Sequence, residues 1–168
     1  MRLKVLLLLS CCPFLVKAQN VKLQVAGTWV NLSEEEMQTE IKPGWTIAGK
    51  KLKDTQVVYL WGKSSHQISD DNQPVFRIVP GKNETLVDYS LIRLKVRKDH
   101  RRLSKSELRE NDYTRIHPES FRIQVDGDSA FICKPLQSFA AGEYILTNIA
   151  QTLGKEQAGY RVYPLRLP

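Results

Sequence analysis

The residues best suited to chemistry in this chain are the cationic side chains of residues 91–97, which alternate with apolar ones. Side chains of a β-strand point alternately to its two faces, so the pattern predicts an inward row and an outward row. Side chains within each row are spaced by about 6.6 Å, twice the strand rise. The inward row is Ile92, Leu94 and Val96. The outward row is Arg93, Lys95 and Arg97.

Further basic residues follow this strand, including Arg101 and Arg102, and extend the cationic segment to residue 109. Clustered cations raise the local potential, so the segment is a candidate site for a polyanion such as an acidic glycan, lipopolysaccharide phosphate or nucleic acid. A solvated strand face that discourages edge pairing is the simpler interpretation. Nucleic acid is the least favoured ligand, because the predicted outward face lacks aromatic side chains on which bases stack.

No spacing in the sequence matches a catalytic or metal motif. The histidines His66, His100 and His117 fall in predicted loops, and no Gly-x-Ser-x-Gly elbow precedes a helix. Cys133 lies in an apolar strand, where a free cysteine is more often a core residue than a nucleophile. We therefore expect no catalytic residues, no cofactor and no metal. A hydrolase whose residues are gathered from loops remains the alternative.

The tryptophans are candidates for stacking against a sugar ring. Trp61 shares a strand face with Val57 and Tyr59, which favours burial. Trp45 follows a Pro-Gly pair in a predicted turn and is the best candidate for an exposed stacking surface.

Short stretches with strand character, separated by turn residues, dominate the chain. They are residues 21–25, 28–32, 56–61, 74–79, 89–97, 120–125, 130–134, 142–148 and 159–167. Capping-box patterns at residues 33–36 and 104–107 are the two helical signals. Because no strand alternates with a long helix, we predict an all-β fold, an antiparallel immunoglobulin-like or fibronectin-like β-sandwich with one or two short surface helices.

Residues 1–18 have the organisation of an export signal. Arg2 and Lys4 precede an apolar run at residues 5–16, and Ala18 occupies the position that a signal peptidase reads. A spanning helix needs about 20 apolar residues, so we expect cleavage and export to the periplasm or the medium, with no transmembrane segment in the mature chain. The Leu-Leu-Ser-Cys pattern ending at Cys11 leaves a lipid anchor open as the alternative.

Removal of residues 1–18 leaves residues 19–168 as one predicted domain. Its formal charge falls from +7 to +4, and Cys133 becomes its one cysteine. A single cysteine forms no internal disulfide, so the domain must be held together by its core. A chain of this length suffices, since a 150-residue domain buries about 70% of its unfolded surface.

Three short sequences occur in order along the chain: Gly-Lys-Ser-Ser at residues 62–65, Ile-Arg-Leu at residues 92–94, and Gly-Glu-Tyr-Ile-Leu at residues 142–146. Together they resemble small secreted proteins of Bacteroidetes that carry no assigned function. The resemblance implies a β-sandwich and supplies no mechanism. Tyr144 has a structural interpretation, because its ring can pack in the core while its hydroxyl reaches a backbone partner.

Asp128-Ser129-Ala130 resembles the short acceptor motif for protein O-glycosylation in the same phylum, and its place at a predicted hairpin turn would expose Ser129. With the export signal, these features predict an exported, non-catalytic domain that acts by binding or by envelope assembly. Its partner is expected to be an unidentified envelope protein or glycan and not nucleic acid. The sequence leaves the oligomeric state open.

Overall fold

We describe the fold from a computed structural model of the protein. The structure describes residues 20–44, 46–48, 50–51, 55–81, 84–104, 113–148 and 160–168. Two antiparallel sheets pack together, which confirms the predicted all-β sandwich. Among the described residues, no helix has the length and apolar composition needed to cross a membrane.

The smaller sheet has five strands in the order β12-β13-β7-β1-β2. These are β12 (Phe121–Asp126), β13 (Ala130–Pro135), β7 (Phe76–Val79), β1 (Asn20–Val25) and β2 (Thr28–Asn31). All five include or overlap a stretch predicted from alternating or apolar residues, although the order of the strands in this sheet was not predicted.

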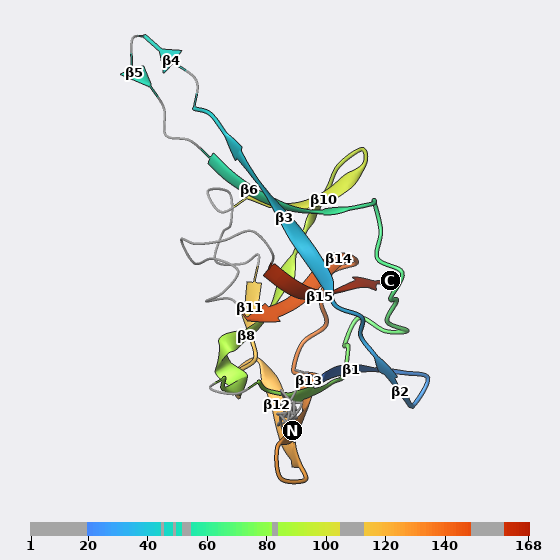
Figure 1. The fold of residues 1–168 in the computed structure, drawn as a ribbon. Helices are drawn as coiled ribbons and strands as arrows, with labels where there is room; N and C mark the ends of the chain where they lie inside the picture. Colours follow the sequence, from blue (N-terminus) through green and yellow to red (C-terminus); the bar gives the residue numbers. More distant parts are fainter. Residues whose placement is uncertain are drawn as a thin grey trace, which may run out of the picture.

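The larger sheet has eight strands in the order β11-β8-β14-β15-β3-β6-β10-β9. These are β11 (Tyr113–Arg115), β8 (Tyr89–Arg93), β14 (Gly142–Asn148), β15 (Tyr160–Leu167), β3 (Glu35–Lys42), β6 (Thr55–Trp61), β10 (His100–Ser104) and β9 (Lys95–Val96). A separate pair, β4 (Thr46–Ile47) and β5 (Lys50–Lys51), lies at the far end of the β3–β6 ladder (Figure 1).

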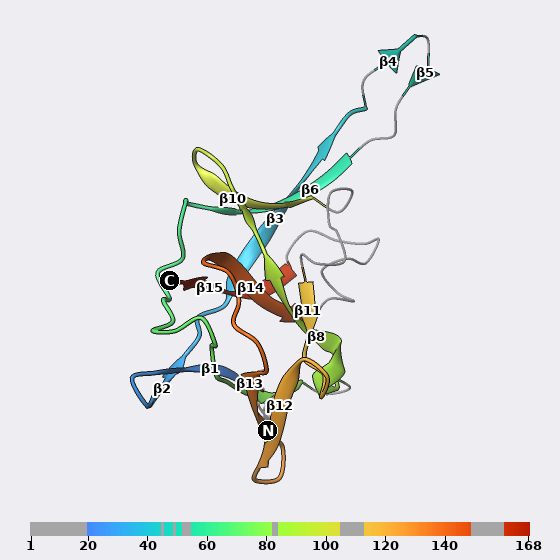
Figure 2. The ribbon, with the colours of Figure 1, turned by 180° about the vertical axis from the view of Figure 1, so that it is seen from behind.

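The larger sheet curls so that β3, β6 and β10 cover one face of β8, β14 and β15, while the smaller sheet covers the other (Figure 1). Figure 2 shows the same three layers from behind. Leu91 and Leu146 pack in the core shared with the smaller sheet, whereas Ile92 and Ile145 pack in the second core under β6 and β10. The middle strands are therefore buried on both faces.

Tyr144 occupies the predicted structural position. It is buried in the core shared with the smaller sheet, and its hydroxyl donates to the Ala140 carbonyl at 2.8 Å. Burial raises the pKa of this phenol, while the charge of Arg93 acts in the opposite direction. The tyrosine of the Gly-Glu-Tyr sequence therefore anchors the start of β14 to the segment that precedes it.

The one or two helical turns predicted to begin at the capping pattern of residues 33–36 are wrong, because Glu35–Lys42 forms β3. Met37 is fully buried in the second core, and β3 pairs with both β15 and β6. These long-range contacts outweigh a local capping pattern. A described helical turn, the 3-10 helix Leu86–Asp88, lies elsewhere, and the signal at residues 104–107 falls mostly outside the described residues.

The predicted strand at residues 89–97 is interrupted at Leu94, whose backbone N–H donates to the Glu143 carbonyl at 2.8 Å. Beyond this break the chain leaves β14, and β9 pairs with β10 instead. Val96 lies on the same face of the hairpin as the buried Arg101, which agrees with its predicted inward direction, but its side chain is 50% exposed. It lies on the edge strand β9, beyond the second core.

The three-layer packing predicts a large effect of Ile145→Ala. Ile145 is fully buried in the second core, so the truncation should lower the free energy of unfolding by about 3 kcal/mol. Val125→Ala is the matched control because Val125 is 67% exposed, and its effect should stay within about 0.5 kcal/mol. Denaturant unfolding measures both. Equal effects would contradict the packing of β6 and β10 on β14.

Candidate functional site

Three aromatic side chains gather on the outer face of β6 and β10. Tyr59 and Trp61 are two residues apart on β6, and His100 lies opposite Trp61 on β10. The ring centroids of Tyr59 and Trp61 are 5.4 Å apart with planes at 85°, and those of Trp61 and His100 are 6.5 Å apart at 81°. Such edge-to-face contacts are favourable arrangements of aromatic rings. The indole is therefore held by neighbours while remaining 59% exposed.

This exposure contradicts the predicted burial of Trp61. Val58 and Leu60 take the positions in the second core, so Trp61 falls on the opposite face of the strand. Residues 57–60 are all apolar or aromatic, and alternation could not distinguish the two faces. His100 pairs with Trp61 on the neighbouring strand. Assigning His100 to a strand would have indicated this surface, but it was assigned to a loop.

Cationic side chains lie on the same face as the rings. Lys95 is opposite Arg102, and Arg102 is opposite Tyr59; directly paired residues project from the same face of a sheet. The Arg97 backbone N–H donates to the His100 carbonyl at 2.8 Å, which places Arg97 beside His100. Lys95 and Arg97 are exposed, as predicted. We call this surface the aromatic-basic face: Tyr59, Trp61, Lys95, Arg97, His100 and Arg102.

Arg101 does not belong to this surface, which corrects its assignment to a polyanion site. It is 1% exposed, and its Nη2 donates to the Trp61 carbonyl and to Glu35, each at 3.2 Å. Its Nη1 lies 3.5 Å from the Glu143 carboxylate. The alternation that turns His100 and Arg102 outward turns Arg101 inward.

Arg93 is exposed, as predicted, but it is separated from Lys95 by the break at Leu94. Its Nη2 donates to the Ala141 carbonyl at 2.9 Å, and its guanidinium lies over Gly142, where an added Cβ would be 3.2 Å from Nε. Arg93 therefore lies against the start of β14. The predicted outward row is divided between two surfaces.

The other predicted site residues lie apart from the aromatic-basic face. Ser129 is exposed in the β12–β13 hairpin turn, and its modification stays a prediction. Trp45 lies outside the described residues. Cys133 is fully buried, and burial raises the pKa of its thiol to about 12, so little thiolate forms at neutral pH.

The histidines give the hydrolase alternative no geometric support. His100 Nδ1 lies 2.6 Å from the Asp99 carboxylate, and His117 Nδ1 accepts from the Glu119 backbone N–H at 3.4 Å. In the described part of the chain, no histidine is hydrogen-bonded to a serine or cysteine side chain. The same residues include no group of three or more His, Cys, Asp or Glu side chains that could hold a metal ion.

Comparisons with protein-family models, curated proteins and solved structures found no match. The aromatic-basic face combines two kinds of group that can bind a ligand. Its aromatic rings offer an apolar stacking surface, and its exposed cations offer partners for anionic groups.

Removal of Arg101 should destabilise the fold strongly. Arg101→Ala leaves the carboxylates of Glu35 and Glu143 without their shared cation, so we expect the free energy of unfolding to fall by about 3 kcal/mol. Arg122→Ala removes an exposed arginine on β12 and should change it by less than about 0.5 kcal/mol. Denaturant unfolding gives both values. A loss no greater than that of the control would show that the buried cluster contributes nothing.

The thiol of Cys133 should be unreactive in the native protein. We expect negligible labelling by a thiol reagent at pH 8 and full labelling in denaturant, with peptide mass mapping to restrict the readout to Cys133. The native pKa is raised from 9.0 to about 12, so the group contributes stability that is lost as the pH rises through this interval. Rapid labelling without denaturant would contradict the burial.

Proposed function

We propose that the protein is an exported, non-catalytic β-sandwich that binds an acidic glycan through the aromatic-basic face. The observation that carries the proposal is the exposed indole of Trp61, held between Tyr59 and His100 on a face that also presents Lys95 and Arg97. The predicted export signal is consistent with a glycan as the partner.

The aromatic part of the face suits a sugar ring. The apolar C–H face of a pyranose can pack on an exposed indole, while its hydroxyl groups stay at the ring edge in contact with water or polar side chains. Tyr59 and Trp61 project from a paired strand and contact each other, so little side-chain freedom is lost on binding. Gln38 adds a fixed polar group, since its Oε1 accepts from the Tyr59 hydroxyl at 3.1 Å.

The basic part of the face suits carboxylate or sulfate groups. Trp61, His100 and Arg97 succeed one another across β6, β10 and the β9 end of the hairpin. With about 4.8 Å between neighbouring strands, the row spans about 10 Å. A glycan of two or more linked rings can therefore stack on Trp61 and place a charged substituent near Arg97. Complementary charge of this kind increases the association rate and the specificity.

Nucleic acid is the competing ligand. The predicted outward row of cations has no aromatic side chains within it, but β6 supplies such rings from a distant part of the chain. Bases also stack on exposed aromatic rings. The expected export signal still favours a glycan, and a single-stranded oligonucleotide belongs in the same binding experiment.

The experiment is isothermal titration with oligogalacturonate, neutral oligosaccharide and single-stranded oligonucleotide. Trp61→Ala should weaken oligogalacturonate binding at least tenfold, equivalent to about 1.4 kcal/mol. The double variant Lys95→Gln, Arg97→Gln should also weaken it and reduce its salt dependence. The control, Arg122→Gln with Lys134→Gln, removes two exposed cations that face each other on β12 and β13, and it should bind normally.

Three results would overturn the proposal. The first is an absence of binding to any acidic glycan. The second is an equal loss of affinity in the control and in the Lys95–Arg97 variant, which would indicate a general charge effect. The third is oligonucleotide binding that is tighter than glycan binding and equally sensitive to Trp61→Ala, which would assign the face to nucleic acid.

A further inference from the structure

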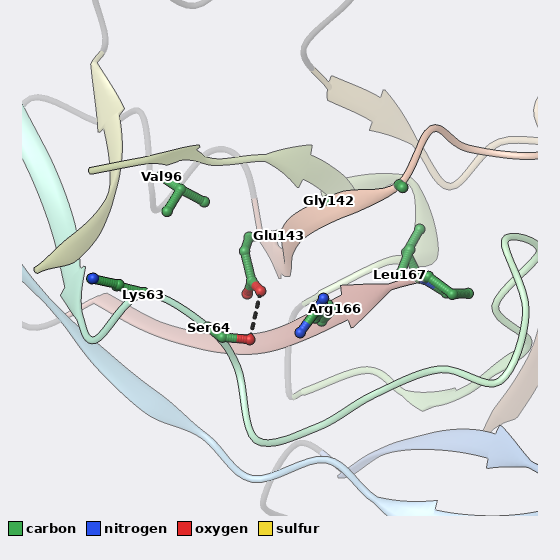
Figure 3. A pocket seen from close by; sticks show the side chains of 9 residues that line it. Lys63, Ser64, Val96, Gly142, Glu143, Arg166 and Leu167 are labelled. Atoms are coloured by element: carbon green, nitrogen blue, oxygen red, sulfur yellow. Dashed lines mark hydrogen bonds between the residues drawn. The ribbon is translucent and has the colours of Figure 1, made fainter. Parts of the chain in front are cut away.

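A second polar surface lies on the other side of β9 from the exposed cations. It is a cleft of about 420 Å³, lined by residues from the loop after β6, from β9, from the start of β14 and from the end of β15. Figure 3 shows Lys63, Ser64, Val96, Gly142, Glu143 and Arg166 around it. Val96 alternates with Lys95 and Arg97 along the chain, so the cleft and the aromatic-basic face lie on opposite faces of the hairpin.

Glu143 is the fixed anion of this cleft. Its Oε1 accepts from the Ser64 hydroxyl at 2.9 Å, and its Oε2 accepts from the Ser65 backbone N–H at 2.8 Å. Arg101 balances its charge from the protein interior, with Nη1 3.5 Å from Oε2. Glu143 is 5% exposed, so these partners hold the carboxylate in place.

These contacts of Glu143 leave Arg166 without an ion pair to a described residue. It lies directly opposite Glu143 in the β14–β15 ladder, a position in which opposite charges normally pair. Because the carboxylate is held by Ser64, Ser65 and Arg101, no ion pair or hydrogen bond joins the Arg166 guanidinium to another described residue. Its side chain instead lines the cleft (Figure 3).

The rest of the cleft defines the ligand further. Lys63 is exposed on the rim, and no ion pair or hydrogen bond of its ammonium group involves a described residue. Each carboxylate oxygen has two lone pairs, so Glu143 retains capacity to accept hydrogen bonds from a hydroxylated ligand. Val96, half exposed beside these groups, offers an apolar contact.

We propose that this cleft is a second binding site and that it takes a small hydroxylated carboxylate, such as a single sugar acid. The ligand carboxylate pairs with the Arg166 guanidinium, whose planar fork matches a carboxylate in bidentate geometry. Ligand hydroxyls donate to Glu143, and the Ser64 hydroxyl oxygen is a further acceptor. The carbon skeleton packs against Val96. The site does not depend on the aromatic-basic face.

The test is titration of the purified protein with glucuronate, followed by calorimetry or by NMR shifts of cleft residues. Methyl glucoside, which lacks the carboxylate, should not bind. Arg166→Gln should lower the glucuronate affinity at least tenfold, and Ser64→Ala should lower it less. Arg166 is exposed, so Arg166→Gln should keep the native melting temperature. Arg122→Gln makes the same charge change on β12 and should bind normally.

Separate arms distinguish this site from the aromatic-basic face and from a phosphate site. Trp61→Ala should leave glucuronate binding unchanged, so a failure of the proposed glycan face would not remove the cleft. An absence of glucuronate binding at millimolar concentration would overturn the proposal. Equal losses in Arg166→Gln and Arg122→Gln would also overturn it, and so would binding of glucose 6-phosphate in preference to glucuronate.

Discussion

The burial of Arg101 is the constraint on which the rest of the structure depends. Transferring a guanidinium from water to the interior costs several kcal/mol unless its donors and charge are satisfied. The carbonyls of Trp61 and Gly62 and the carboxylate of Glu35 accept hydrogen bonds from this cation. The carboxylate of Glu143 adds a charge contact 3.5 Å from Nη1, which makes no hydrogen bond to a described residue. Because these groups belong to β3, to the end of β6 and to β14, the guanidinium fixes three parts of the larger sheet around itself.

Both candidate surfaces follow from this buried cation. On β10 the inward position of Arg101 turns His100 and Arg102 outward, beside Trp61 and Tyr59. On β14 the engagement of Glu143 by Arg101 and the Ser64–Ser65 loop separates that carboxylate from its cross-strand neighbour Arg166. One buried contact therefore assembles the aromatic-basic face and leaves a cation in the cleft behind it.

The sequence predicts those parts of the fold that are governed by local pattern. The stretch at residues 142–148 forms a strand with the predicted bounds, and the β12–β13 hairpin forms around its predicted turn. Arg101 was assigned to the candidate polyanion site because a basic run is usually solvated, and nothing local indicates that carboxylates from β3 and β14 converge on it. Trp61 was misplaced for the same reason, since its exposure depends on which face of β6 meets the second core.

The register of β10 gives a reason to retain the buried charge of Arg101. A slip of β10 by one residue would exchange its two faces, placing His100 and Arg102 inside and Arg101 outside. Purely apolar packing penalises this slip weakly, because Leu103 is the one apolar residue on β10. A slip in one direction would bring His100 opposite Leu60, so that an imidazole would replace the guanidinium beside Glu35 and Glu143, and Arg102 would enter the second core opposite Val58. A slip in the other direction would bring Arg102 beside the carboxylates but would remove Leu103 from that core. The native register is therefore the one that keeps Arg101 beside its carboxylates and Leu103 in the second core, and it is also the one that places aromatic and basic side chains on a common face.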